Sequence, residues 1–69
     1  MSVKSNMAGT VWKVLVKPGD KVAAGQDVII LESMKMEIPI TAEADGVVKS
    51  VICKEGDFIN DGDTVVDFE

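Results

Sequence analysis

Two stretches of this chain repeat each other and decide its fold: GTVWKVLVKPGDKVAAGQDVIILE, residues 9–32, and GVVKSVICKEGDFINDGDTVVDFE, residues 46–69. They align without a gap at a constant offset of 37 residues, and Gly19 of the first stretch is matched by Gly56 of the second. A repeat of this length predicts two similar half-domains that pack about a pseudo-twofold axis. The residues between the copies then form a link that belongs to neither half.

The length of the chain predicts a single domain, residues 1–69. A chain of this size is close to the lower limit at which one core is stable without disulfides or metal. The lone Cys53 excludes an intrachain disulfide, and the absence of histidine removes the commonest general base and metal ligand. Little catalytic or metal-binding chemistry is therefore open to this chain.

The charge of the chain argues against nucleic-acid and membrane partners. Seven lysines, no arginine and twelve acidic residues give a net charge of -5, which repels phosphate backbones and anionic lipid surfaces. No run approaches the roughly 20 apolar residues that a membrane span needs, and no targeting segment is visible. These features predict a soluble, cytoplasmic domain, and they suit a free-standing protein as well as a domain of a larger subunit.

Short runs rich in valine and isoleucine alternate with glycine, proline and aspartate, which predicts an all-β fold. Type II turns are expected at residues 17–20 and 54–57, where glycine stands at the third position, and further glycine turns at Gly25 and Gly62. We expect strands at residues 9–16, 27–32, 36–42 and 64–69, and Pro39 indicates an edge or a bulge in the third of these instead of a central position. Short strands with frequent turns suit a small closed β-barrel or a two-sheet sandwich.

Comparison of the two copies predicts which strand faces are buried. Ile30 is matched by Asp67, and an aspartate is rarely buried without a partner. The alternate positions are therefore expected to face the core, and Val28 and Val65 to lie on the outer face or the rim. The predicted core positions are Ile29, Leu31, Val66 and Phe68.

The link after the first copy contains ESMKME, residues 32–37, with apolar strand-like residues on both sides. A hairpin turn is therefore expected on Met34 and Lys35. Two-residue hairpin turns favour Asn-Gly or Asp-Gly, because their central residues need positive φ. Since Met-Lys breaks this local rule, the turn is a candidate functional site with Lys35 on display. The structural alternative is a lysine on a solvated tip above two methionines.

Other candidate residues are less specific. Trp12 is matched by Lys49, so the pattern leaves open whether it lies in the core or at the rim. Cys53 is matched by Val16 and is expected to be a small apolar residue instead of a reactive thiol. Residues 57–63 resemble the start of a calcium loop, but their equivalence to residues 20–26 favours a repeated turn.

In the link around Lys35 and in the glycine turns, the chain resembles the biotinyl domain family, the carrier domains of biotin-dependent carboxylases. It resembles less closely the lipoyl domains of 2-oxo acid dehydrogenases. The resemblance runs through residues 7–9, 16–20, 31–37 and 45–46. In that family the lysine of the Met-Lys-Met triplet is the covalent attachment site, which corresponds to Lys35, and the flanking methionines correspond to Met34 and Met36. Lipoyl domains usually carry an acidic residue before the lysine and a small one after it.

Three positions depart from the pattern of the family. Ser33 stands where alanine is usual, and Asn6 and Glu43 stand where proline is common. Ser33 lies beside the attachment site, and together with Glu37 it is a candidate contact for the ligase. Glu32 and Glu37 also have the simpler interpretation of solvated acids at strand ends.

The resemblance implies the fold of an all-β barrel-sandwich hybrid, a small flattened barrel or sandwich of two pseudo-twofold-related four-stranded halves with the attachment lysine on a β-hairpin. It also implies a carrier domain biotinylated on Lys35 that shuttles carboxyl groups between a biotin carboxylase and a carboxyltransferase. A lysine amine is almost fully protonated at neutral pH, so a biotin protein ligase has to supply the activated acid and the base. Two alternatives stay open: a lipoyl carrier with lipoate on Lys35, and an unmodified structural or binding domain of the same fold. An enzyme with a Schiff-base lysine would need a desolvated amine, which a hairpin tip does not offer.

Overall fold

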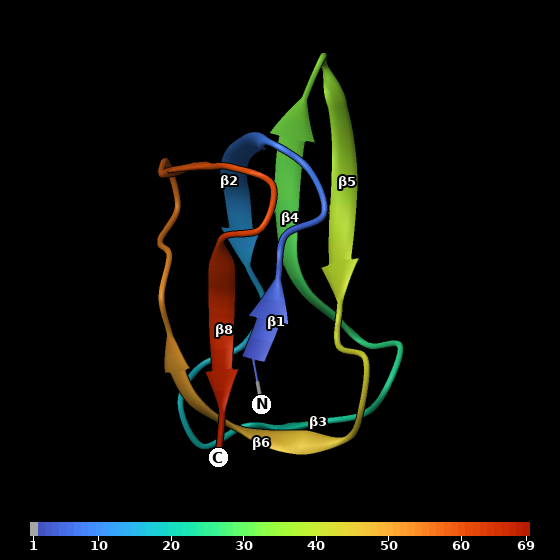
Figure 1. Ribbon diagram of the computed structural model, residues 1–69, viewed down its shortest axis with the longest axis vertical. Helices are drawn as coiled ribbons and strands as arrows, with labels where there is room; N and C mark the ends of the chain where they lie inside the picture. Colours follow the sequence, from blue (N-terminus) through green and yellow to red (C-terminus); the bar gives the residue numbers. More distant parts are fainter. Residues whose placement is uncertain (1) are drawn as a thin grey trace.

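The computed structural model describes residues 2–69, and every regular element in this part of the chain is a β-strand. The eight strands form two four-stranded antiparallel sheets that pack face to face (Figure 1). The expected all-β sandwich of two four-stranded halves is confirmed. The strands are β1 (Ser2–Lys4), β2 (Gly9–Val14), β3 (Lys21–Val22), β4 (Asp27–Ser33), β5 (Met36–Thr41), β6 (Gly46–Val51), β7 (Phe58–Ile59) and β8 (Thr64–Phe68).

The two sheets are related by the same offset of 37 residues that relates the sequence copies. One sheet has the order β1-β8-β6-β3 and the other the order β5-β4-β2-β7. The equivalence extends to single hydrogen bonds: the N–H of Gly19 donates to the carbonyl of Val48 at 2.8 Å, and the N–H of Gly56 donates to the carbonyl of Val11 at 2.9 Å. It also reaches beyond the sequence repeat, because β1 takes the place of the last three residues of β5. The predicted pseudo-twofold is confirmed.

The core lies between the sheets. The expected core positions Ile29, Leu31, Val66 and Phe68 are all buried, which confirms that face of β4 and β8. The expectation that Val28 and Val65 lie on the outer face or rim was wrong, since both are fully buried. Each lies at a bulge, where the ladder to β5 or to β1 skips one residue. A bulge interrupts the alternation of buried and exposed residues along a strand. The prediction assumed strict alternation and therefore failed at these two positions.

Four glycine turns connect the strands, at the positions that the repeat predicts. Gly19 and Gly56 have φ of 93° and 95°, the left-handed values that the third position of a type II turn requires. In both turns an aspartate closes the loop: Asp20 Oδ2 accepts the N–H of Lys17 at 3.0 Å, and Asp57 Oδ2 accepts that of Lys54 at 3.0 Å. The predicted type II turns are confirmed.

The strands end within two residues of their expected bounds. The strand expected at residues 9–16 ends at Val14, the one at 27–32 continues to Ser33, and the one at 36–42 ends at Thr41. Such differences are usual at strand ends. Pro39 lies in β5, which forms the edge of its sheet as predicted. Among residues 2–69 there is no helical segment that could span a bilayer.

Candidate functional site: the β4–β5 hairpin

The molecule measures 31 × 19 × 18 Å along its principal axes. A protruding hairpin that joins β4 to β5 lies at one end of the longest axis (Figure 1). Ser33 pairs with Met36 across it, which leaves Met34 and Lys35 as a two-residue turn. Their φ values are 52° and 63°, and they are the only non-glycine residues with positive φ in residues 2–69. Positive φ at both central residues is the type I′ pattern. The predicted hairpin turn on Met34 and Lys35 is therefore confirmed.

The conformation of this turn is unfavourable for its own residues. A side chain in the left-handed region costs roughly 1–2 kcal/mol because its Cβ crowds the following carbonyl. The paired strands β4 and β5 compensate for it, since six residue pairs from Asp27–Thr41 up to Ser33–Met36 hold the two arms together. The paired strands thus hold the strained turn at the end of the hairpin.

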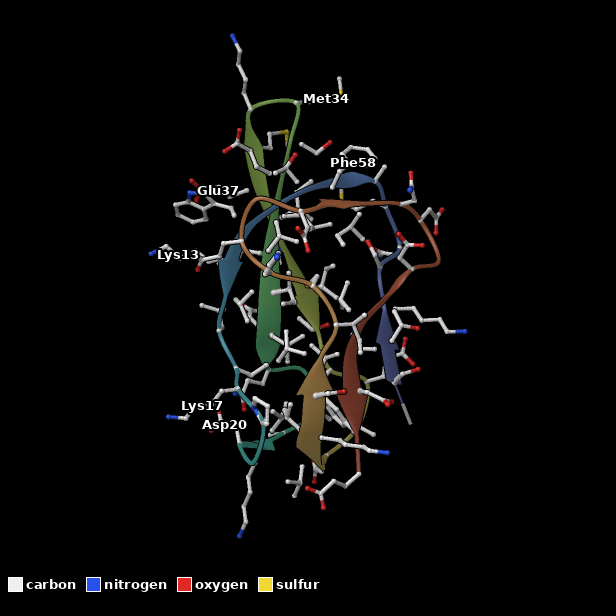
Figure 2. All side chains as sticks on the ribbon, turned by 90° about the vertical axis from the view of Figure 1, so that its left-hand side faces the viewer. Lys13, Lys17, Asp20, Met34, Glu37 and Phe58 are labelled. Atoms are coloured by element: carbon white, nitrogen blue, oxygen red, sulfur yellow. The ribbon has the colours of Figure 1, made fainter. Side chains whose placement is uncertain are left out.

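The side chains of the tip extend into solvent. Met34 is 91% exposed and Met36 is 61% exposed, and both Lys35 and Glu37 are exposed. Figure 2 shows Met34 at the far end of the hairpin and Glu37 on its flank. Ser33 is half-buried, so it is the least accessible of the candidate site residues. The structure therefore brings the five predicted residues into one continuous hairpin.

Gly9 supports the base of the hairpin, a role that the sequence did not reveal. A Cβ at this position would lie 3.0 Å from the carbonyl oxygen of Glu32 and 3.4 Å from Cβ of Ser33. Only glycine lets β2 approach β4 this closely without a shift. The available signal was the match of Gly9 with Gly46, where a Cβ would meet the ring of Phe68.

The remaining candidates lie away from the tip. Trp12 is 41% exposed at a bulge in β2, and Lys13 Nζ lies 5.4 Å from its ring centroid. Cys53 is buried as expected, and burial raises the pKa of its thiol. In the calcium-like stretch, Asp63 Oδ2 accepts the N–H of Asn60 at 2.9 Å, so this aspartate also closes a turn. Within residues 2–69 no group of three or more His, Cys, Asp or Glu side chains could hold a metal ion.

The chemistry open to the site follows from this exposure. A lysine amine in full contact with water lacks the desolvation that would make it a nucleophile on its own. Within residues 2–69, the cavities of about 430–500 Å³ contain no residue of the hairpin, and a smaller one of about 130 Å³ is lined by Pro39, Ile40 and Thr41 at the end of β5 that is far from the tip. The tip presents its amine to solvent.

Comparison with known proteins decides the family. The model of the biotin/lipoyl family, described as "Biotin-requiring enzyme", matches residues 1–68. The chain belongs to the biotin/lipoyl attachment family. It is an attachment domain that acts as a non-catalytic carrier and is homologous to the biotin carrier domains of carboxylases.

Relatives of the attachment domain include both free-standing and embedded proteins. It is 58% identical over 67 residues to the biotin/lipoyl attachment protein of Bacillus subtilis, covering 97% of this chain and 92% of that protein. It is 48% identical over 67 residues to the human mitochondrial propionyl-CoA carboxylase alpha chain, covering 97% of this chain but 9% of that protein. It is also 45% identical over 64 residues to the dihydrolipoyllysine-residue acetyltransferase component of the pyruvate dehydrogenase complex of Pseudomonas aeruginosa, covering 93% of this chain and 12% of that protein.

Solved structures share the fold of the attachment domain. The urea carboxylase of Kluyveromyces lactis superposes with a TM-score of 0.89 at 38% identity, over 96% of this chain and 6% of that one. Similarity at this level confirms that the two-sheet sandwich is the fold of a carboxylase domain.

Proposed function

We propose that this domain carries biotin as an amide on Nζ of Lys35 and moves carboxyl groups between a biotin carboxylase and a carboxyltransferase. The observation that carries the proposal is the position of Lys35 in the two-residue turn, beside a methionine that is 91% exposed. An amine held there by paired strands can enter the active site of another protein. Tethering then replaces diffusional encounter by a high effective concentration.

The strain in the turn supports a role in presentation. Asn-Gly would relax both left-handed residues, whereas this chain keeps Met34 and Lys35 there. A local rule broken at an exposed tip is typical of a residue retained for function. The structural alternative, a lysine on an idle tip, gives no reason to maintain an exposed methionine on each side of it.

Acylation at Lys35 requires another enzyme. The exposed amine has no histidine in the chain to take its proton, so a biotin protein ligase has to supply both the base and the adenylated acid. The amine attacks the activated carbonyl, the amide bond forms, and AMP leaves. When bound, biotin supplies a ring nitrogen that accepts a carboxyl group, and the protein contributes position and reach.

The methionines support biotin over lipoate. Met34 and Met36 match the biotinyl pattern on both sides of the lysine, whereas lipoyl domains usually have an acidic and a small residue there. We assign recognition by the ligase to Met34 and Met36, with Ser33 and Glu37 as further contacts. The carrier is assigned to the cytoplasm, in line with its composition.

Lipoate on Lys35 is the second candidate, because the attachment domain is 45% identical to a dihydrolipoyllysine-residue acetyltransferase component. The two cofactors differ in the enzymes that they serve: biotin implies a carboxylase, and lipoate a 2-oxo acid dehydrogenase. The identity alone does not separate them, and the preference for biotin is based on the residues on each side of Lys35.

Intact-mass measurement of the protein isolated from its native host tests the proposal. A biotin increment, mapped by peptide sequencing to residues 31–49, is the expected result. A lipoyl increment on the same lysine would favour the second candidate. An unmodified chain in cells with active ligases, or an increment on another lysine, would contradict the assignment.

A further inference from the structure

The outer face of β2, β4 and β5 lies directly below the turn at Met34 and Lys35. Cross-strand pairing puts Lys13, Ile30 and Pro39 in one row and Thr10, Glu32 and Glu37 in the next. Neighbours in a row point to the same side of a sheet, and the residue between the rows on β4, Leu31, is fully buried. Both rows therefore face solvent, and Figure 2 shows Glu37 and Lys13 on the same side of the molecule.

A bulge adds Trp12 to this surface. The pairing of β2 with β4 skips Trp12, which is 41% exposed and lies under Lys13 Nζ. We call this surface the hairpin flank and define it by Trp12, Ile30, Glu32, Glu37 and Pro39.

The other half of the molecule provides an internal control for the flank, because it has the same bulge and the same register. Each apolar residue of the flank has a polar equivalent 37 positions away. Trp12 is matched by Lys49, Ile30 by Asp67 and Pro39 by Ser2. Thr10, which lies on the same face next to the flank, shows the opposite difference: it is polar and its equivalent, Val47, is apolar.

This contrast shows that the fold does not require apolar residues on the flank. The same backbone positions in the second sheet are occupied by Lys49 and Asp67. Trp12 and Pro39 are exposed and Ile30 is half-buried. A cluster of solvent-facing apolar side chains that folding does not need indicates a contact with another molecule. Tryptophan in particular is enriched where protein interfaces gain most of their binding energy.

The two halves also differ in their balance of lysines and acidic residues. Residues 9–14, 27–32, 39–41 and 54–59, which surround the flank and have equivalents in the other half, contain two lysines and four acids. Their equivalents, residues 46–51, 64–69, 2–4 and 17–22, contain four lysines and three acids. The flank is thus an apolar patch bordered by the carboxylates Glu32 and Glu37 and by one lysine, Lys13.

We propose that the hairpin flank is the docking surface for the ligase that acylates Lys35, and that the ligase meets it with an apolar patch bordered by lysine or arginine. This inference rests on the proposed function. The ligase has to bring the lysine amine itself into its active site, so it approaches the domain more closely than an enzyme that meets the cofactor at the end of its tether.

The dimensions of the flank agree with this assignment. Ile30 precedes Lys35 by five residues, which is about 17 Å along a strand. A standard interface covers about 800 Å² of each partner, a patch roughly 30 Å across. A ligase that encloses the tip and extends down one side therefore reaches Trp12 and Ile30. Complementary charge speeds such an encounter and fixes its orientation.

The test exchanges residues between the two halves. The flank variant is the whole chain with Trp12→Lys and Ile30→Asp. The new residues are those found at the equivalent bulge and strand of the other half, and the net charge is unchanged. With a purified biotin protein ligase, biotin and ATP, we expect kcat/KM for biotin transfer to fall at least tenfold, mainly through KM. The matched control, Lys49→Trp with Asp67→Ile, changes the same positions in the other half and should be biotinylated at the wild-type rate.

Several outcomes would overturn the inference. Wild-type kcat/KM for the flank variant would do so, as would an equal loss in the control. Normal ligation with impaired turnover in a carboxylase assay would assign the flank to that enzyme, and a dimer that the flank variant abolishes would assign it to a second copy. If the flank variant does not unfold cooperatively, Trp12→Gln with Ile30→Thr replaces it. A wild-type chain that accepts no biotin would overturn the proposed function as well as this inference. A wild-type chain that accepts biotin, together with an unaffected flank variant, would overturn this inference alone.

Discussion

Met34 and Lys35 are adjacent and both occupy the left-handed region, with φ of 52° and 63°, in a turn that contains no glycine or asparagine. The exposed amine and the backbone strain are therefore located in the same two residues. Replacement of either residue can separate what the turn contributes to stability from what it contributes to attachment.

Replacement of Lys35 by arginine should abolish attachment and leave stability nearly unchanged. Arginine keeps the charge and the strain of the turn, and an exposed tip makes few contacts, so the free energy of unfolding should change by less than about 0.5 kcal/mol. Intact mass and urea unfolding measure the two effects. A large loss of stability would mean that Lys35 has a structural role.

Replacement of Met34 by asparagine should stabilise the domain and slow its modification. Asparagine tolerates the left-handed region that methionine occupies here, so we expect a gain of about 0.5–1 kcal/mol. The ligase would lose one of the two methionines that flank Lys35. A melting curve and the rate of biotin transfer test both parts, and a less stable variant with unchanged kinetics would contradict both.

Replacement of Glu55 by proline should also stabilise the domain. Glu55 is the second residue of a type II turn whose equivalent has Pro18 in the same place. Proline fits that φ and reduces the freedom of the unfolded chain, which is worth about 0.5–1 kcal/mol. Glu55→Ala, which lacks the ring, is the control. A fall in melting temperature for the proline variant alone would show that the two turns differ.

Replacement of Gly46 by alanine should destabilise the core. A Cβ at this position would lie 2.6 Å from Cδ2 of the buried Phe68 ring, and such overpacking typically costs about 1–3 kcal/mol. Ser50→Ala on the same strand should change stability by less than about 0.5 kcal/mol. Equal unfolding midpoints in urea for the two variants would mean that the ring moves aside at no cost.

Cys53 should make stability depend on pH in alkaline solution. Burial, opposed by a backbone hydrogen bond and assisted by Asp57, raises the pKa of its thiol above the ordinary value of 9.0. Above pH 9 the unfolded chain loses the thiol proton while the folded chain keeps it, so this contribution is complete below pH 9 and is lost as the pH rises toward the raised pKa. Cys53→Val, which introduces the residue found at the equivalent position 16, should lose less stability above pH 9 than the wild type. Parallel pH profiles would contradict this.

The repeat was sufficient to predict the two matching halves and their turns, because glycine and aspartate recur where the backbone demands them. The hairpin was predicted from the apolar runs on both sides of residues 32–37. The repeat failed at Val28 and Val65, since a bulge turns two consecutive residues inward and leaves no mark in the composition. The position of Trp12 stayed open for the same reason. The role of Gly9 at the base of the hairpin depends on contact distances, which no sequence pattern contains.

Pro39 has a consequence for how many copies of this domain can work close together. It lies on β5, the edge strand that runs up to the tip. A proline has no N–H to donate, so this edge is a poor template for an added strand from a neighbouring molecule. Copies of this domain at high local concentration should then stay separate instead of polymerising through this edge.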